Sequence, residues 1–262
     1  MEELQWKTLQ LLDDILGIKL DLNLKQPFLK FHGFITNPEP EFLKIWRKDE
    51  RLNNWYNKIC NSILGDVQNA YACVLYSYVN LENLEKDAHN VIIESKLIET
   101  LKNGQGIGVG NTLRWDFEYQ SFILAYRRLL DYLAIGISAY FKNNFNSFRT
   151  LKENLKKLNK PNETENIILT IEKYLPLFDF VLSDGNRKSI RDSITHKGYA
   201  SVGVLNINKK GIILVGGPEN LNLFGKEIVT LAEIQMMRIE NLRKCISELI
   251  ENYIQIMQQN ET

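Results

Sequence analysis

Apolar side chains recur at steps of three or four residues along most of the chain, a spacing that is typical of amphipathic helices. Together with cap and breaker residues, the repeats predict helices over residues 3–17, 39–65, 66–102, 112–142, 146–159, 163–182, 186–197 and 223–259. Large apolar side chains nearly encircle the helix over 112–142, so we expect it at the centre of the fold.

Glycine and proline residues mark the predicted breaks between these helices. Residues 18–38 contain Pro27, Gly33 and Pro38, and we predict that they are irregular. Residues 103–111 contain four glycines and follow a helix, so we interpret them as a flexible connection. The alternative is a nucleotide-binding loop, but the Lys-Ser/Thr pair that ends a phosphate-binding loop is missing.

Only one stretch has the composition of β-strands. Residues 202–207 and 212–215 are rich in valine and isoleucine and flank a turn at 208–211, which predicts a β-hairpin over about 202–215. The sequence therefore predicts an all-α fold, a multi-helix bundle with one hairpin before a long C-terminal helix. We expect an N-terminal helical extension over 1–110 and a helical domain over 111–262.

Composition and charge limit the binding partners and the cellular compartment that we expect. The chain has 32 basic and 32 acidic residues, so no net charge draws it to nucleic acid or to a membrane. Three cysteines lie far apart without a Cys-x-x-Cys pair, which favours free thiols in a reducing compartment. The acidic N-terminus is not typical of a secretory signal, and no apolar run is long enough to cross a bilayer. We expect a soluble cytoplasmic protein without a membrane partner.

The candidate chemistry lies in residues 189–200, Ser-Ile-Arg-Asp-Ser-Ile-Thr-His-Lys-Gly-Tyr-Ala, towards the end of a predicted helix. Four residues separate Arg191 from His196, and Gly198 fits a left-handed helix cap. Five helical steps turn a side chain by about 500°, so Arg191 and His196 lie about 140° apart unless the helix loosens near its end. Asp192 and His196 share a helix face, where the carboxylate can hold the imidazole in one tautomer.

An arginine, a histidine and an orienting acid suit the cleavage of a phosphodiester. The guanidinium matches phosphate oxygens and stabilises the charge that grows in the transition state. The histidine can take a proton from a ribose 2′-hydroxyl or give one to the leaving oxygen. The sequence shows no cluster of metal ligands, so we expect a route without metal or cofactor, with RNA as the substrate.

The run Arg191-Asp192-Ser193-Ile194-Thr195-His196 resembles the hallmark of the HEPN superfamily, which is an arginine, four to six residues and a histidine, often with a polar residue after the arginine. The resemblance covers roughly residues 112–255, and the helix over 112–142 resembles the first core helix of that family. It implies a metal-independent endoribonuclease of toxin–antitoxin, phage-defence or RNA-processing systems. It also implies that Arg191 and His196 are the catalytic pair and that Asp192 supports them.

Four further residues are candidates for RNA binding. Arg187 lies one turn before Arg191, Thr195 shares its face, and Lys197 follows the motif. Glu118 is a candidate because the resemblance implies an acidic partner on the first core helix. The resemblance also implies a homodimer, which we expect to form through the C-terminal helical bundle. A protein antitoxin or a nucleotidyltransferase antitoxin is a further partner that it implies.

The same residues also have a structural interpretation. Arg191 can bridge to a carboxylate on a neighbouring helix, and His196 can satisfy a carbonyl at a helix end. The alternative function is therefore a non-catalytic HEPN-like helical interaction module.

Two other patterns are weaker. Glu85 and His89 lie four residues apart but provide too few donors for a metal site. A basic stripe follows one helix face, and we interpret it as a solvated face, with a phosphate-binding surface as the alternative. The stripe consists of Arg149, Lys152, Lys156 and Lys160.

Overall fold

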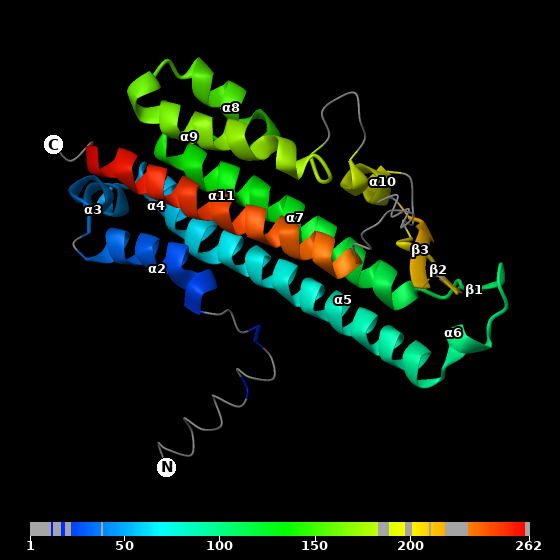
Figure 1. The fold of residues 1–262 in the computed structure, drawn as a ribbon. Helices are drawn as coiled ribbons and strands as arrows, with labels where there is room; N and C mark the ends of the chain where they lie inside the picture. Colours follow the sequence, from blue (N-terminus) through cyan, green and yellow to red (C-terminus); the bar gives the residue numbers. More distant parts are fainter. Residues whose placement is uncertain are drawn as a thin grey trace, which may run out of the picture. The chain divides into compact units, whose positions relative to one another are not determined.

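Most of the helices predicted from the apolar spacing are present in the structure, a computed structural model (Figure 1). It describes residues 12, 17–18, 22–37, 39–182, 189–196, 201–209, 211–217 and 230–259. In these residues the fold is mostly helical with one small antiparallel sheet, which confirms the predicted fold class. No helix in the described part of the chain combines the length and apolar character that a bilayer crossing requires.

The element bounds are as follows. The helices are α2 (Leu22–Thr36), α3 (Glu41–Lys48), α4 (Asn53–Cys60), α5 (Gln68–Glu94), α6 (Leu97–Thr100), α7 (Leu113–Tyr140), α8 (Phe148–Lys157), α9 (Pro161–Tyr174), α10 (Ile190–His196) and α11 (Leu231–Gln259). A π-helix, η1 (Asn61–Val67), joins α4 to α5, and a 3₁₀ turn, η2 (Leu175–Phe178), follows α9. The strands are β1 (Gly106–Val109), β2 (Gly203–Asn208) and β3 (Gly211–Gly216).

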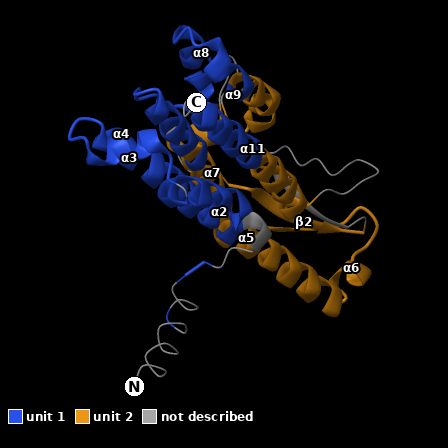
Figure 2. Ribbon diagram, turned by 90° about the vertical axis from the view of Figure 1, so that its left-hand side faces the viewer, with its two compact units in different colours: residues 1–76, 129–167, 246–262 blue, residues 77–128, 168–245 orange. Residues whose placement is uncertain are grey.

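The chain divides into two compact units, which Figure 2 colours separately. Unit 1 consists of residues 1–76, 129–167 and 246–262, and unit 2 consists of residues 77–128 and 168–245. Both units contain residues from each side of position 110. The division into a 1–110 extension and a 111–262 domain stays a prediction.

Helix α2 corrects the prediction that residues 18–38 are irregular. The helix runs over Leu22–Thr36 with Pro27 inside it, although proline lacks the N–H that an interior helical position needs. Burial explains the outcome, because Phe28, Phe31 and Ile35 are all less than 7% exposed on one side of this helix. The predicted helix over 3–17 lies almost wholly outside the described residues.

The predicted helix over 39–65 is also corrected at both its middle and its end. It breaks after α3, where Asp49 Oδ1 accepts hydrogen bonds from the backbone N–H groups of Arg51 at 2.8 Å and Leu52 at 2.9 Å. It does not stop at Gly65, because the π-helix carries the chain through this glycine into α5. Ile63 and Val67 on either side of Gly65 are buried, so packing continues across the glycine.

The glycine-rich segment over residues 103–111 contains a third strand, β1, which the sequence did not predict. β1 pairs antiparallel with β2 from Gly106 opposite Asn208 to Val109 opposite Leu205, and β2 pairs with β3 as the predicted hairpin. The interpretation of residues 103–111 as a flexible connection was therefore wrong. The glycines allow the close pairing, since a Cβ on Gly106 would lie 3.1 Å from Asn206 Oδ1.

In unit 1, a glycine and a tyrosine join the helices at close range. Gly136 of α7 packs against η1 so tightly that a Cβ would lie 2.8 Å from Ile63 Cδ1 and 3.2 Å from Ser62 Cβ. The buried hydroxyl of Tyr253 in α11 donates to Gly136 O at 2.7 Å. The Tyr253 ring also stacks on Phe31 of α2, with centroids 6.0 Å apart. The missing side chain of Gly136 therefore allows α7 and η1 to pack closely, while Tyr253 joins α11 to α7 and α2.

In unit 2, Glu85 of α5 caps the first turn of α11. Its carboxylate accepts a hydrogen bond from the backbone N–H of Ala232 at 3.2 Å, one of the donors that a helix start leaves without a partner. Burial raises the pKa of the Glu85 carboxyl, although its hydrogen bonds to the backbone lower it. The cap explains this acid without a metal, and the described residues hold no group of three or more His, Cys, Asp and Glu side chains arranged for one.

Replacing Glu85 with glutamine tests this cap. Because the folded chain raises the pKa of Glu85, the stability gained from the protonated carboxyl is fully present below the ordinary value of 4.5 and is lost as the pH rises through the raised pKa. Glutamine keeps an oxygen acceptor and does not ionise. We expect urea unfolding to show the Glu85→Gln variant gaining stability relative to the parent as the pH is raised from about 4 to about 8.

The control is Glu94→Gln, at an exposed position of the same helix. Its difference from the parent should vary less with pH than that of Glu85→Gln. A difference for Glu85→Gln that stays constant over this pH range would contradict the buried-carboxyl interpretation.

Candidate functional site

Helix α10, which carries the Arg191–His196 motif, begins with a reciprocal capping box. The backbone N–H of Asp192 donates to Ser189 Oγ at 3.2 Å, and the backbone N–H of Ser189 lies 3.4 Å from Asp192 Oδ2. Ser189 is only 3% exposed, so water does not replace its hydroxyl at this helix start. The sequence Ser-Ile-Arg-Asp thus starts the helix by the pairing that such a spacing favours.

An aromatic cluster fixes the position of this helix start within unit 2. The backbone N–H of Ile190 donates to Phe180 O at 2.9 Å. The Phe180 ring packs edge-on against Tyr126 of α7 at 4.9 Å and beneath the Arg238 guanidinium of α11 at 3.7 Å. The Tyr126 hydroxyl donates to Arg238 O at 3.0 Å, which closes the cluster. The motif helix therefore begins beside Phe180, which α7 and α11 both contact.

The Arg191 guanidinium is half-buried and oriented by its neighbour in sequence. Arg191 Nη1 lies 3.1 Å from Asp192 Oδ1, and the two side chains are 34% and 20% exposed. A guanidinium carries five N–H donors, and this contact uses one of them. Asp192 therefore contacts both the arginine and the helix cap, and the exposed part of the guanidinium can meet an anion from solvent.

His196 is the last residue of α10, so the helix runs through the whole motif. A regular helix places the two Cα atoms about 140° apart around the axis and about 7.5 Å apart along it. A loosening of the helix before His196, which would bring the two side chains to one face, is therefore not seen in the backbone. The imidazole of His196 is not among the described side chains, and Arg187, Lys197 and Gly198 lie outside the described residues.

The two remaining predicted site residues have local partners. Thr195 is exposed, and its hydroxyl donates to Arg191 O at 3.0 Å, one turn earlier in the same helix. Glu118 of α7 is half-buried and accepts a hydrogen bond from Asn80 of α5 at 3.0 Å. No hydrogen bond joins Glu118 to a residue of α10 that the structure describes. Glu118 thus contacts the neighbouring α5, and no described side chain of the motif joins it.

Asp116 is a buried acid near the motif that sequence analysis did not single out. It is 2% exposed, near the start of α7. Its Oδ1 accepts hydrogen bonds from the backbone N–H of Val202 at 2.6 Å and from Ser201 Oγ at 3.2 Å. The Thr112 hydroxyl donates to Gly203 O at 3.1 Å and lies 3.4 Å from Asp116 Oδ2.

These contacts join the central helix to the segment that follows the motif. Ser201 comes five residues after His196 and leads directly into β2. A buried carboxylate is tolerated only with hydrogen-bond donors around it, and here the donors come from the chain just beyond the motif. The available sequence signal was an acid near the start of the predicted helix over 112–142, which large apolar side chains nearly encircle.

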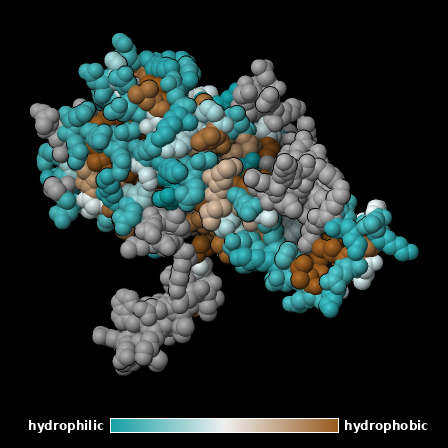
Figure 3. Space-filling model, in the orientation of Figure 1, coloured by the Kyte–Doolittle hydropathy of each residue, from teal (hydrophilic) through white to brown (hydrophobic). Residues whose placement is uncertain are grey.

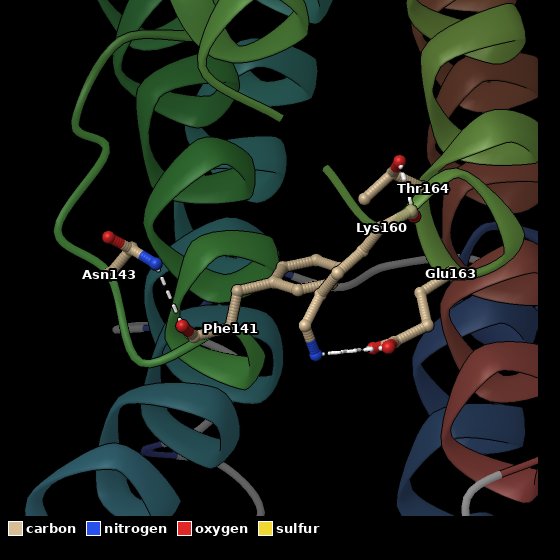
Figure 4. Close-up of polar contacts among 5 residues, drawn as sticks. All are labelled: Phe141, Asn143, Lys160, Glu163 and Thr164. Carbon is tan, nitrogen blue, oxygen red and sulfur yellow. Dashed lines mark hydrogen bonds and ion pairs between the residues drawn. The ribbon is translucent and has the colours of Figure 1, made fainter. Parts of the chain in front are cut away.

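The basic stripe lies among acidic side chains in unit 1. Lys152 Nζ lies 3.3 Å from the Glu153 carboxylate, and Lys160 Nζ lies 3.0 Å from that of Glu163 (Figure 4). The Thr164 hydroxyl donates to Lys160 O at 2.8 Å, one turn earlier in the chain. These contacts favour the interpretation as a solvated face, because local carboxylates offset part of the positive charge.

Comparisons with protein-family models, curated proteins and solved structures found no match to this chain. The resemblance to the HEPN superfamily therefore rests on the motif and its position before the hairpin and the long C-terminal helix.

Replacing Asp116 with alanine is expected to destabilise the fold. The change leaves the Val202 N–H without its buried acceptor, and an unsatisfied buried donor costs about 1–3 kcal/mol. Urea unfolding followed by circular dichroism measures the loss. The matched control is Asp66→Ala, at an exposed position of η1, which should change the free energy of unfolding by less than about 0.5 kcal/mol. Equal effects for the two variants would count against a structural role for Asp116.

Proposed function

We propose that this protein is a metal-independent endoribonuclease of HEPN type, with Arg191 and His196 as its catalytic residues. The observation that carries the proposal is the half-exposed Arg191 guanidinium on a short helix that ends at His196. Phosphodiester cleavage needs a cation that stabilises the phosphate charge and a group that moves protons. Arg191, oriented by the Asp192 carboxylate, is the proposed cation, and His196 is the proposed proton carrier. A homodimer and an antitoxin partner, whether a protein or a nucleotidyltransferase, belong to the same proposal.

The proposed reaction uses the ribose 2′-hydroxyl as the nucleophile. The 2′-oxygen loses its proton to a base and attacks the phosphorus, and the bond to the 5′-oxygen of the next nucleotide breaks. The 5′-oxygen leaves with a proton, and the products carry a 2′,3′-cyclic phosphate and a 5′-hydroxyl. Arg191 binds the non-bridging oxygens and stabilises their charge, while His196 moves a proton.

Asp192 acts in this proposal as a positioning residue. Its Oδ1 contacts the Arg191 guanidinium, and its Oδ2 lies at the helix cap. The carboxylate thereby limits the directions in which the arginine can extend its remaining donors. A guanidinium that is held before the substrate arrives loses less conformational entropy when it binds phosphate.

A non-catalytic interaction module is the second candidate function. The observation that favours it is the same contact, because Asp192 already gives Arg191 a partner within the chain. In that case the motif would be a structural helix start, and RNA would remain uncut.

Cleavage of RNA by the full-length chain in EDTA tests the proposal. We expect the parent to cut and to leave cyclic-phosphate ends, and we expect His196→Ala and Arg191→Ala each to lower the rate about 10²–10⁴-fold. The matched control is Arg128→Ala, which removes an exposed arginine of α7 and should retain the parental rate. Absence of cutting by the parent, or equal cutting by all variants, would leave the interaction module as the better account.

A comparison of Ser189→Ala with Asp192→Asn separates positioning from capping. Both variants weaken the capping box and should lose about 0.5–2 kcal/mol of stability. Only Asp192→Asn removes the charge that holds Arg191. We therefore expect Asp192→Asn to lower kcat at least 10-fold more than Ser189→Ala, measured where both are fully folded. Equal kcat values for the two variants would restrict Asp192 to the cap.

A further inference from the structure

The outer edge of β1 is open among the described residues. The sheet order is β1-β2-β3, and β1 pairs on one side only, with β2. All four residues of β1 are exposed. An edge strand of this kind presents backbone N–H and C=O groups to which another extended segment can bind.

The sequence of this edge lacks the usual protection against such pairing. Folded monomers protect their edge strands with lysine, proline or a bulge. Residues 103–113 contain no charged residue and no proline. Gly106 and Gly108 have no side chains on their face of the strand, so a second backbone can approach closely.

An apolar groove of about 550 Å³ lies beside the same strand in unit 2. Its lining includes Leu84, Val91, Val109, Leu113 and Leu205. Val91 is 65% exposed and Leu113 is 61% exposed, which is unusual for side chains of this size. Figure 3 shows apolar residues gathered at the end of unit 2 where α6 and β1 lie. An exposed apolar patch of this kind is typical of a protein–protein contact.

Two charged residues on the groove favour a second copy of this chain as its occupant. Asp87 of α5 and Arg114 of α7 both line the groove, and both are exposed. Neither forms an ion pair with any residue that the structure describes. A two-fold contact places the same surface on both sides, so Asp87 of each copy can face Arg114 of the other. The groove is therefore complementary to itself in charge as well as apolar in character.

We propose that a second copy of this chain docks here, with the two β1 strands antiparallel across a two-fold axis. The two three-stranded sheets then form one continuous sheet, and the two apolar grooves close on each other. This contact replaces the C-terminal bundle as the dimer interface, because α11 already buries most of its apolar side chains within a single chain. This interface rests on the homodimer that belongs to the proposed function, but it uses neither Arg191 nor His196. Dimer formation and RNA cleavage are measured separately, so either proposal can fail while the other stands.

Sedimentation equilibrium of the full-length chain over a range of concentrations tests the interface. We expect the parent to have twice the chain mass and Ile107→Lys to raise the dissociation constant at least 100-fold, because a lysine on an edge strand opposes pairing. Ile107 is 37% exposed, so its replacement should leave the fold intact, as circular dichroism and the melting temperature will check. The control is Leu169→Lys, an equally drastic change at a 55% exposed position of α9, which should stay dimeric.

A charge exchange provides a second test that does not touch the strand. Asp87→Arg and Arg114→Asp should each weaken the dimer about 10-fold, because each creates two pairs of like charges. The double variant restores opposite charges across the axis and should return close to the parental dissociation constant. A parent that is monomeric at every concentration, an Ile107→Lys dimer as tight as the parent, or a double variant no tighter than the single ones would overturn the proposal.

Discussion

The contact between Asp116 and the chain at Ser201 and Val202 joins α7 to the chain that enters the sheet of unit 2. A carboxylate that is 2% exposed needs donors, and this one takes them from a segment far along the chain. That segment lies between the motif helix and β2. The buried acid therefore holds the chain just before β2 against α7, and the pairing of β2 with β1 and β3 extends this attachment to the sheet.

The motif helix depends on contacts of the same kind. α10 has only seven residues, and a helix of this length does not form by itself in water. The Ser189–Asp192 capping box and the bond from Ile190 to Phe180 supply the missing stability. Because Asp192 serves both the cap and Arg191, the formation of the helix and the orientation of the guanidinium are coupled. This coupling gives the candidate site a guanidinium that is oriented before any anion binds.

The outer edge of β1 differs from these paired contacts, because its backbone N–H and C=O groups face no other strand of the described chain. β2 pairs with a strand on each side, whereas β1 pairs on one side only and all four of its residues are exposed. The neighbouring groove adds exposed apolar side chains and two charges of opposite sign. Burying such a surface against a second protein lowers its free energy relative to exposure to water. Water can bond to the polar strand edge, but contact with water is unfavourable for the apolar groove.

The sequence alone determined the elements whose signals are local. The apolar repeat of α7, the hairpin of β2 and β3 and the position of the Arg191–His196 motif on a helix were all predictable, because periodicity, turn residues and caps act within a few residues. The tertiary structure decided the rest. Pro27 lies inside α2 because Phe31 is buried there, and residues 106–109 form a strand because β2 offers a partner. Burial and strand pairing depend on residues far apart in the chain, and so no local pattern revealed the role of Asp116 or the open edge of β1.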